Sequence, residues 1–177
     1  MKSRYQWFLI LFLILLSGCV HVISKDLRVK SDPHLTLGLV RQNPESYKGK
    51  WVVWGGEVIE TTNQKDETTL IEIFQRPLDW REEPKRTNIS EGRFLILSEK
   101  YLDPYIFGSG RRVTVAGEIL GEKIRPLGEM DYRYPLVLSK QVHLWDYYYS
   151  YPYYYYDPWW WGYPYWWRPN FYYYRPY

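Results

Sequence analysis

The sequence is poor in the residues that most often carry metal or redox chemistry, because its 177 residues include one cysteine, three histidines and two methionines. A single cysteine excludes an intramolecular disulfide. The histidines are dispersed along the chain and have no cysteine partner, so we expect no zinc site. The Gly-x-Ser-x-Gly motif that holds the nucleophilic serine of many hydrolases is also absent, which leaves covalent hydrolysis without a candidate residue. We therefore expect no enzyme, no metal and no cofactor.

A large excess of charge is also missing. The chain has 23 basic and 20 acidic side chains, a formal net charge of +3. Proteins that bind phosphate backbones normally carry a clustered basic excess, so nucleic acid is not an expected partner. No apolar run reaches the roughly 20 residues that a membrane-spanning helix needs. The run from Trp7 to Leu16 has ten residues.

That short apolar run has the features of an export signal. Lys2 and Arg4 precede it, and the small residues Ser17 and Gly18 follow it, directly before Cys19. The four residues 16–19 resemble the lipobox of bacterial lipoproteins. The resemblance implies that residues 1–18 are removed, that the Cys19 sulfur receives a diacylglycerol, and that the new amino terminus is acylated. A plain secretory signal and an uncleaved anchor are the alternatives.

Acylation of Cys19 would make membrane lipid the partner of the chain. Each buried methylene contributes about 0.8 kcal/mol, so two or three acyl chains hold a protein almost permanently. Lipoproteins with aspartate after the cysteine tend to stay in the inner membrane, whereas this chain has Val20. We expect an outer-membrane protein that faces the periplasm.

Beyond the signal, the pattern predicts a tether at residues 19–34, a β domain at 35–145 and a tail at 146–177. The segment 35–42, followed by Asn43-Pro44, predicts a short helical segment with a break. Alternating apolar residues, separated by glycine and proline signals, then predict five strands, which are 51–59, 69–74, 93–98, 112–120 and 134–144.

Five short strands without a long amphipathic helix predict an all-β fold, a small five-stranded OB-like antiparallel barrel. Gly55-Gly56 inside the first strand predicts a sharp bend. The tetrapeptide at 76–79, Arg-Pro-Leu-Asp, is interpreted as a turn, because proline fixes a backbone angle and aspartate accepts hydrogen bonds from nearby amides. The carboxylates Glu57, Glu72, Asp79 and Asp103 could pair in the fold, but charged residues at strand ends and turns are usually solvated, and we interpret them so.

Many short motifs, in order from the lipobox to Trp145, resemble the Slp family of outer-membrane lipoproteins. The resemblance implies an acyl-anchored envelope protein associated with stationary phase or stress, without an established enzymatic reaction. The main motifs are Asn43-Pro44, Tyr47-Lys48-Gly49-Lys50, Val53-Trp54-Gly55-Gly56, Arg76-Pro77-Leu78-Asp79, Glu91-Gly92-Arg93-Phe94, Leu102-Asp103-Pro104, Val113-Thr114-Val115-Ala116-Gly117, Tyr134-Pro135 and Leu144-Trp145.

The carboxyl-terminal tail departs from that family pattern. Residues 147–177 contain 14 tyrosines, five tryptophans and one phenylalanine, interrupted by five prolines that exclude a long helix or a central strand. A loosely packed low-complexity extension is one interpretation. Because tyrosine and tryptophan rings favour the bilayer interface and also stack on sugars, membrane or glycan contact is another. The candidate residues for this contact are Trp159, Trp160, Trp161, Trp166 and Trp167.

Together these features predict a non-enzymatic structural or interaction protein of the bacterial envelope, with peptidoglycan or another envelope component as a candidate partner. The alternative is a periplasmic binding module for a glycan, a lipid or a small ligand. In that case we expect the ligand to lie on the barrel near Trp51, Trp54 and Trp80.

Overall fold

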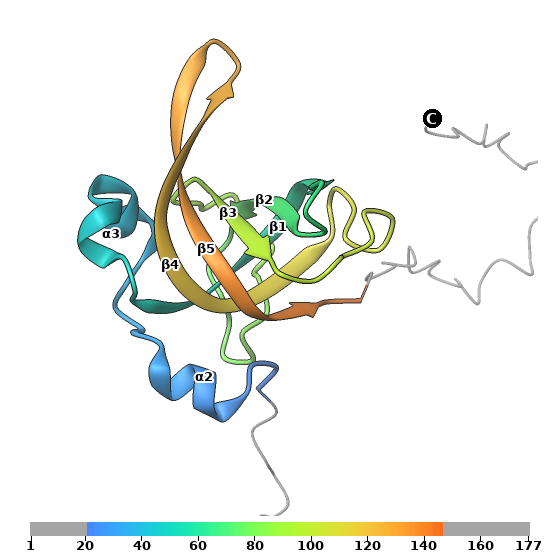
Figure 1. Cartoon of the computed structure of the whole chain (residues 1–177). Helices are drawn as coiled ribbons and strands as arrows, with labels where there is room; N and C mark the ends of the chain where they lie inside the picture. Colours follow the sequence, from blue (N-terminus) through green and yellow to red (C-terminus); the bar gives the residue numbers. More distant parts are fainter. Residues whose placement is uncertain (1–20, 147–177) are drawn as a thin grey trace, which may run out of the picture. The chain divides into compact units, whose positions relative to one another are not determined.

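The computed structural model describes residues 21–146. Cys19 and the five candidate tail tryptophans lie outside the described residues, as do the predicted signal and nearly all of the predicted tail. The described elements, shown in Figure 1, are α2 (Lys25–Lys30), α3 (Leu37–Gln42), the 3-10 helix η1 (Pro44–Tyr47), β1 (Trp51–Asn63), β2 (Thr69–Gln75), β3 (Arg93–Ser98), β4 (Arg112–Leu127) and β5 (Met130–Leu144).

The five strands form a closed barrel in the order β1-β2-β3-β5-β4, with β4 paired back to β1. This confirms the predicted all-β, OB-like architecture. Four of the five neighbouring pairs are antiparallel, as expected, and only β3 and β5 run parallel. The reason is geometric: strand directions cannot alternate around a closed ring with an odd number of strands, so at least one neighbouring pair must be parallel.

The glycine pair in β1 lies where the strand passes from one pairing partner to the other. β1 pairs with β4 from Trp51 to Glu57 and with β2 from Gly56 to Asn63, so Gly56 belongs to both ladders. A Cβ atom on Gly56 would overlap the carbonyl oxygen of Phe74 and lie 2.8 Å from Cγ2 of Ile73. Glycine is therefore needed here for close backbone approach rather than for an unusual backbone angle.

β4 and β5 continue well beyond the predicted strands. Their ladder extends to the pair Leu127 and Met130, and Gly128 begins the turn between them with φ of +62°. Figure 1 shows this part of the hairpin as a twisted ribbon that projects from the barrel, and we call residues 121–136 the arm. β1 is also longer than predicted, because it runs on to Asn63 instead of ending at residue 59.

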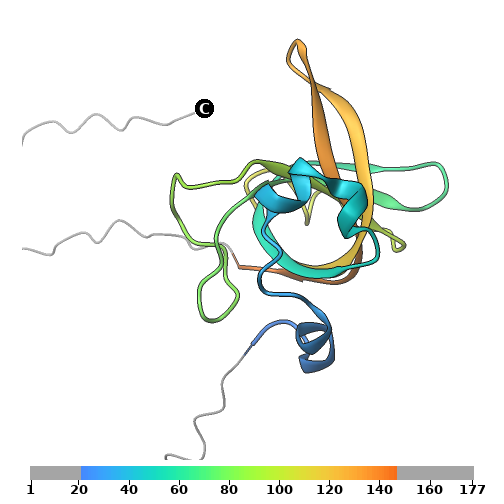
Figure 2. The same ribbon diagram turned by 90° about the vertical axis from the view of Figure 1, so that its left-hand side faces the viewer.

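The barrel core is closed at both ends by segments outside the sheet. At one end, α3 contributes the buried side chains of Leu37 and Val40, and Figure 2 shows α3 and η1 over the barrel opening. This agrees with the predicted helical segment that breaks before Pro44. Leu102 and Phe107, from the connection between β3 and β4, are half-buried and also pack against the core.

Residues 21–34, which the sequence placed in a tether, contain α2 and are bound to the barrel. Ile23 is buried, and its backbone N–H donates to Oε2 of Glu82 at 2.9 Å. Gln141 on β5 accepts from the N–H of Ser24 at 3.0 Å and donates to the carbonyl oxygen of Val22 at 2.8 Å. No helix in residues 21–146 has the length and apolar character needed to cross a membrane.

Candidate functional site

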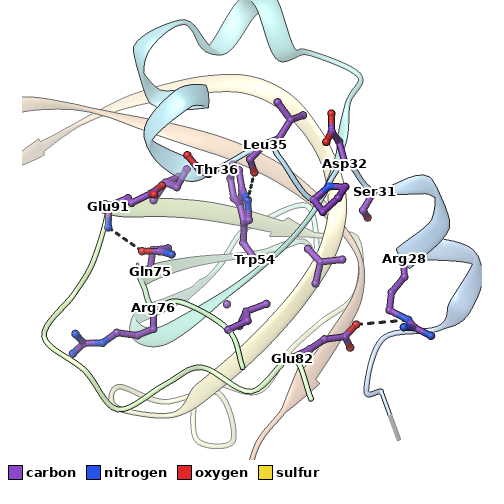
Figure 3. Close-up of a pocket in the computed structure, with 15 residues that line it drawn as sticks. Arg28, Ser31, Asp32, Leu35, Thr36, Trp54, Gln75, Arg76, Glu82 and Glu91 are labelled. Atoms are coloured by element: carbon purple, nitrogen blue, oxygen red, sulfur yellow. Dashed lines mark hydrogen bonds and ion pairs between the residues drawn. The ribbon is translucent and has the colours of Figure 1, made fainter. Parts of the chain in front are cut away.

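A pocket of about 440 Å³ lies between the amino-terminal segment and the barrel. One wall comes from the stretch that joins α2 to α3, and the other comes from β1 and the long connection between β2 and β3. Figure 3 shows the side chains that converge on it. The lining residues are Arg28, Ser31, Asp32, Pro33, Leu35, Thr36, Leu37, Val53, Trp54, Gly55, Gln75, Arg76, Leu78, Glu82 and Glu91.

The connection between β2 and β3 folds against β1 because Gly55 has no side chain. A Cβ atom on Gly55 would lie 2.6 Å from Cδ2 of Leu78 and 2.8 Å from the carbonyl oxygen of Val113. Asp79 shapes the following turn, since its Oδ1 accepts from the N–H groups of Arg81 and Glu83, both at 2.8 Å. This is the turn chemistry predicted for residues 76–79, and it places Leu78 in the pocket wall.

Trp54 is a fixed part of the pocket. Its ring packs edge to face on Phe94 with a centroid distance of 5.4 Å, and only 7% of the residue is exposed. Its indole Nε1–H donates to the carbonyl oxygen of Leu35 at 2.9 Å, a contact drawn in Figure 3. The other two tryptophans of the predicted binding face are not in the pocket wall: Trp51 lies under the ammonium of Lys30, and Trp80 is exposed.

The charged groups around the pocket are paired with one another. Glu91 accepts from the N–H of Gly38 at 2.6 Å, which joins the β2–β3 connection to α3. Arg76 lies with its Nε 3.4 Å from Oε1 of Glu57, and Arg28 lies with its Nε 3.6 Å from Oε1 of Glu82. The pocket therefore combines an apolar floor with a rim of both charge signs, a lining suited to a small amphipathic ligand.

The two arginines at the rim are held by carboxylates. Nε of Arg28 and Nε of Arg76 are buried and have no hydrogen bond of good geometry within the described residues, although both have the ion-pair contacts given above. A buried donor without a hydrogen bond is costly. The neighbouring carboxylates of Glu82 and Glu57 offset this cost, so these side chains serve to fix the rim of the pocket.

A second polar cluster lies on the outer surface of the barrel, where the arm joins it. Arg93 on β3 donates to Oε1 of Glu72 on β2 at 2.6 Å, and the hydroxyl of buried Tyr134 on β5 donates to the same oxygen at 3.3 Å. The hydrogen bond to Glu72 raises the pKa of the Arg93 guanidinium above its ordinary value. Burial, followed by the nearby Glu72 charge, raises the pKa of the Tyr134 phenol above 10.0.

This cluster fastens the base of the arm to β2 and β3. The interpretation of Glu72 as a solvated carboxylate was wrong, because only 7% of the residue is exposed and it is ion-paired. An acidic residue in the middle of the apolar run 69–74 was the signal for a buried pair, since a buried carboxylate needs a partner. Glu57 is half-buried and paired with Arg76.

The described residues contain no group of three or more histidine, cysteine, aspartate or glutamate side chains arranged to hold a metal ion. The structure thus brings together a pocket at the amino-terminal segment and a buried polar cluster at the arm. Of the residues singled out in the sequence, Trp54 and the turn at 76–79 contribute to the pocket. Cys19 and the tail tryptophans are not among the described residues.

Comparison with known proteins places the chain among envelope lipoproteins. It is 34% identical over 123 residues to lipoprotein YeaY of Escherichia coli K12, a match that covers 70% of this chain and 63% of that protein. It is 29% identical over 139 residues to outer membrane protein Slp of the same organism, covering 77% of this chain and 73% of that protein. The chain thus spans less than two thirds of the length of the first of these relatives.

Two solved structures share limited similarity with the chain. One is a mitochondrial single-stranded DNA-binding protein from S. cerevisiae, with 13% identity, a TM-score of 0.35, and coverage of 55% of this chain and 95% of that one. The other is a small single-stranded DNA-binding protein from Streptomyces coelicolor, with 11% identity, a TM-score of 0.36, and coverage of 54% and 94%. Similarities at this level have no bearing on function.

The sequence profile of the Outer membrane lipoprotein Slp family matches residues 16–167, which is most of the chain and includes the predicted lipobox, the barrel and part of the tail. The chain is a member of the Slp family of outer membrane lipoproteins.

Proposed function

We propose that Cys19 is acylated and that the mature chain is a periplasm-facing lipoprotein of the outer membrane, with a non-enzymatic structural or interaction role in the envelope. Membership of a family of outer membrane lipoproteins supports both the localisation and the class of protein. The matched region begins at Leu16, the first residue of the predicted lipobox. A role in stationary-phase or stress adaptation is the finer part of this proposal, and it rests on the resemblance described for the sequence.

The observation that carries the proposal is the lipobox-like sequence at 16–19, inside the region that the family matches. The docking of residues 22–24 on the barrel adds how near to this anchor the folded domain begins. The backbone of this segment makes three hydrogen bonds, to Glu82 and Gln141, and the side chain of Ile23 is 2% exposed. Folded structure therefore begins within four residues of Cys19. Acyl chains on that sulfur would hold the barrel close to the bilayer rather than at the end of a long tether.

Fractionation of cells that express Cys19→Ser tests the proposal. We expect the variant to leave the outer-membrane fraction, because it has no sulfur to receive a diacylglycerol. Ser17→Ala is the matched control, since it keeps a small residue before the cleavage site and should remain membrane-bound. Retention of Cys19→Ser in the outer membrane would contradict acylation as the anchor.

The pocket favours a second candidate function, a binding module for a glycan, a lipid or a small ligand. Its lining includes the apolar residues Trp54, Leu37 and Leu78, and its rim carries the charged residues Arg28, Arg76 and Glu82. A lipid with one acyl chain and a phosphate head would match both parts, and so would a disaccharide peptide of the cell wall. Calorimetric titration with lysophosphatidylethanolamine and with a muropeptide distinguishes the two classes.

A pocket-filling variant makes that titration specific. Val53→Phe adds a ring to a half-buried position of the pocket wall and should abolish binding. Ile59→Phe makes the same kind of change at a position of β1 that is 37% exposed, and it should bind as the unaltered protein does. Equal heats of binding for the unaltered protein and both variants would show that any binding lies outside the pocket.

For the tail, we propose that Trp159, Trp160, Trp161, Trp166 and Trp167 contact the membrane interface or envelope glycans. Support comes from composition, because amphipathic rings favour the headgroup region and also stack on sugars. Chains truncated after residue 146 should still be acylated and membrane-bound but should lose binding to purified peptidoglycan if glycan is the partner. Unchanged binding after truncation would contradict glycan contact by the tail.

A further inference from the structure

We propose that one defined surface of the barrel domain rests on the phospholipid headgroups of the membrane that holds the acyl chains. This surface, which we call the anchor face, consists of α2 and the turn at residues 79–82. Its exposed side chains are those of Lys25, Asp26, Val29, Lys30, Trp80 and Arg81. The inference rests on the proposed acylation of Cys19 and goes beyond it, because it specifies which side of the domain meets lipid.

The short connection between Cys19 and Ile23 sets this orientation. Four residues fully extended span at most about 14 Å, which is the upper limit of the distance from Cys19 to Ile23. Ile23 is fixed by its buried side chain and by its N–H bond to Glu82. The polar headgroup region of a bilayer leaflet is itself about 5 to 7 Å thick, so side chains that project beside Ile23 reach the headgroups.

The two parts of the anchor face, α2 and the turn at 79–82, meet at the carboxylate of Glu82. Oε2 of Glu82 accepts from the N–H of Ile23 at 2.9 Å, and Oε1 of the same carboxylate lies 3.6 Å from Nε of Arg28 on α2. Glu82 has φ of +69°, which a non-glycine residue adopts uncommonly, and this conformation occurs where the turn meets the amino-terminal segment. Glu82 therefore joins the turn, α2 and the start of the folded chain.

The composition of this face suits a headgroup layer. Trp80 is 72% exposed and Val29 is 78% exposed, although both are large apolar residues. The guanidinium of Arg81 lies over the Trp80 ring at 5.6 Å. Tryptophan with adjacent basic side chains is the combination that favours the membrane interface.

α2 itself has the character of an interfacial segment. It contains three basic residues and one acidic residue, and none of its six residues is buried. So short a helix gains little stability from its own hydrogen bonds. Basic residues near an anionic leaflet are attracted to it. Contact with lipid would cover the exposed apolar side chain of Val29 and place Lys25 among the headgroups.

The arm lies on the other side of the domain. In Figure 1, α2 and the start of the described chain are at the bottom, whereas the tip of the β4–β5 hairpin is at the top. Figure 2 shows the same separation after rotation by 90°. Met130 stands next to the hairpin turn and is 56% exposed. It therefore provides a matched reference position directed away from the membrane.

Site-directed spin labelling of the full-length mature lipoprotein tests the anchor face. Cys19 is the only cysteine, and its sulfur is a thioether once acylated, so an introduced cysteine is the single reactive thiol. Val29→Cys, Trp80→Cys and Met130→Cys all alter exposed side chains and should melt as the unaltered protein does. The labelled proteins are inserted into phosphatidylethanolamine vesicles that contain a minor fraction of phosphatidylglycerol.

We expect labels at 29 and 80 to collide several-fold less often with a water-soluble nickel chelate than the label at 130, and more often with oxygen, which concentrates in lipid. Equal accessibility at all three positions, with Cys19 shown by mass spectrometry to be acylated, would overturn the anchor face alone. A mass that shows Cys19 unmodified, with two labels on each chain, would overturn both this inference and the proposed function.

Discussion

Replacing Ile23 with alanine tests whether the amino-terminal segment is a fixed part of the barrel domain. The Ile23 side chain is 2% exposed although it stands only four residues after Cys19. The substitution removes three carbons from a buried site, and at about 0.8 kcal/mol for each buried methylene the cost is about 2.4 kcal/mol. The amino-terminal segment can detach from the barrel while the barrel stays folded. The substitution therefore lowers the free energy that holds this segment on the barrel.

The consequence is a larger population of undocked chains. At about 1.4 kcal/mol for each factor of ten, a loss of 2.4 kcal/mol raises that population about fiftyfold. The next backbone contact with the barrel is at Asp32, whose N–H donates to the carbonyl oxygen of Trp51 at 2.9 Å. If the segment detaches up to Asp32, the connection between Cys19 and the barrel lengthens from four residues to thirteen. Its maximum span would increase from about 14 Å to about 45 Å.

Trypsin digestion of the vesicle-bound lipoprotein measures this change. Cleavage at Lys25, Arg28 or Lys30 in α2 releases the barrel from the vesicle, and its rate follows the undocked population when opening is fast relative to cleavage. We expect Ile23→Ala to release the barrel tens of times faster than the unaltered protein. Met130→Ala is the control, because it removes a side chain that is 56% exposed and stands next to the β4–β5 turn. Equal release rates for the two variants would refute the docking of Ile23.

Two further predictions concern the barrel itself. Gly56→Ala should lower the free energy of unfolding by about 3 kcal/mol, the upper range for overpacking, because the added Cβ meets the Phe74 backbone. Gly128→Ala, in open space but at φ of +62°, should cost about 1 to 2 kcal/mol, and equal urea midpoints would contradict this ranking. The raised pKa of Tyr134 predicts that stability declines as pH rises above 10.0, because the unfolded chain loses the phenolic proton first. The stability of the unaltered protein relative to Tyr134→Phe should therefore fall across that range, and a constant difference would argue against a perturbed phenol.

The parts of the fold that bury apolar side chains in alternation were predictable from the sequence. β3 was predicted at its observed bounds, and β2 was predicted to within one residue, because Ile71, Ile73 and Phe94 point into the core. Gly55-Gly56 was also singled out as a special position of the first strand, and the structure shows a close backbone approach at Gly56.

The arm was missed because it is stabilised differently. Residues 121–127 pair with 130–136 through backbone hydrogen bonds. Residues 122–133, which lie outside the predicted strands, have half-buried or exposed side chains that need no apolar alternation. Pro126 further weakened the strand signal, although an unpaired edge tolerates proline. Period-two patterns report burial on one face, so a ribbon that projects into solvent leaves little trace in the sequence.

α2 and the pocket wall could not be predicted for another reason. α2 has no buried residue and no side-chain cap, and it is held by contacts with residues far along the chain, such as Arg28 with Glu82 and Lys30 with Trp51. Such pairings become visible only when the fold brings the segments together. Trp54 was identified as a pocket residue, but its hydrogen bond to Leu35 could not be predicted. The acceptor is a backbone carbonyl oxygen, which every residue has, so the sequence does not show which residue it comes from.

Mass spectrometry of the amino-terminal peptide, from protein purified out of the outer-membrane fraction, decides whether Cys19 is the lipid anchor. We expect a chain that begins at Cys19 and carries a diacylglycerol on its sulfur and an acyl group on its amino terminus. A peptide that retains residues 1–18, or one with an unmodified Cys19 thiol, would contradict it.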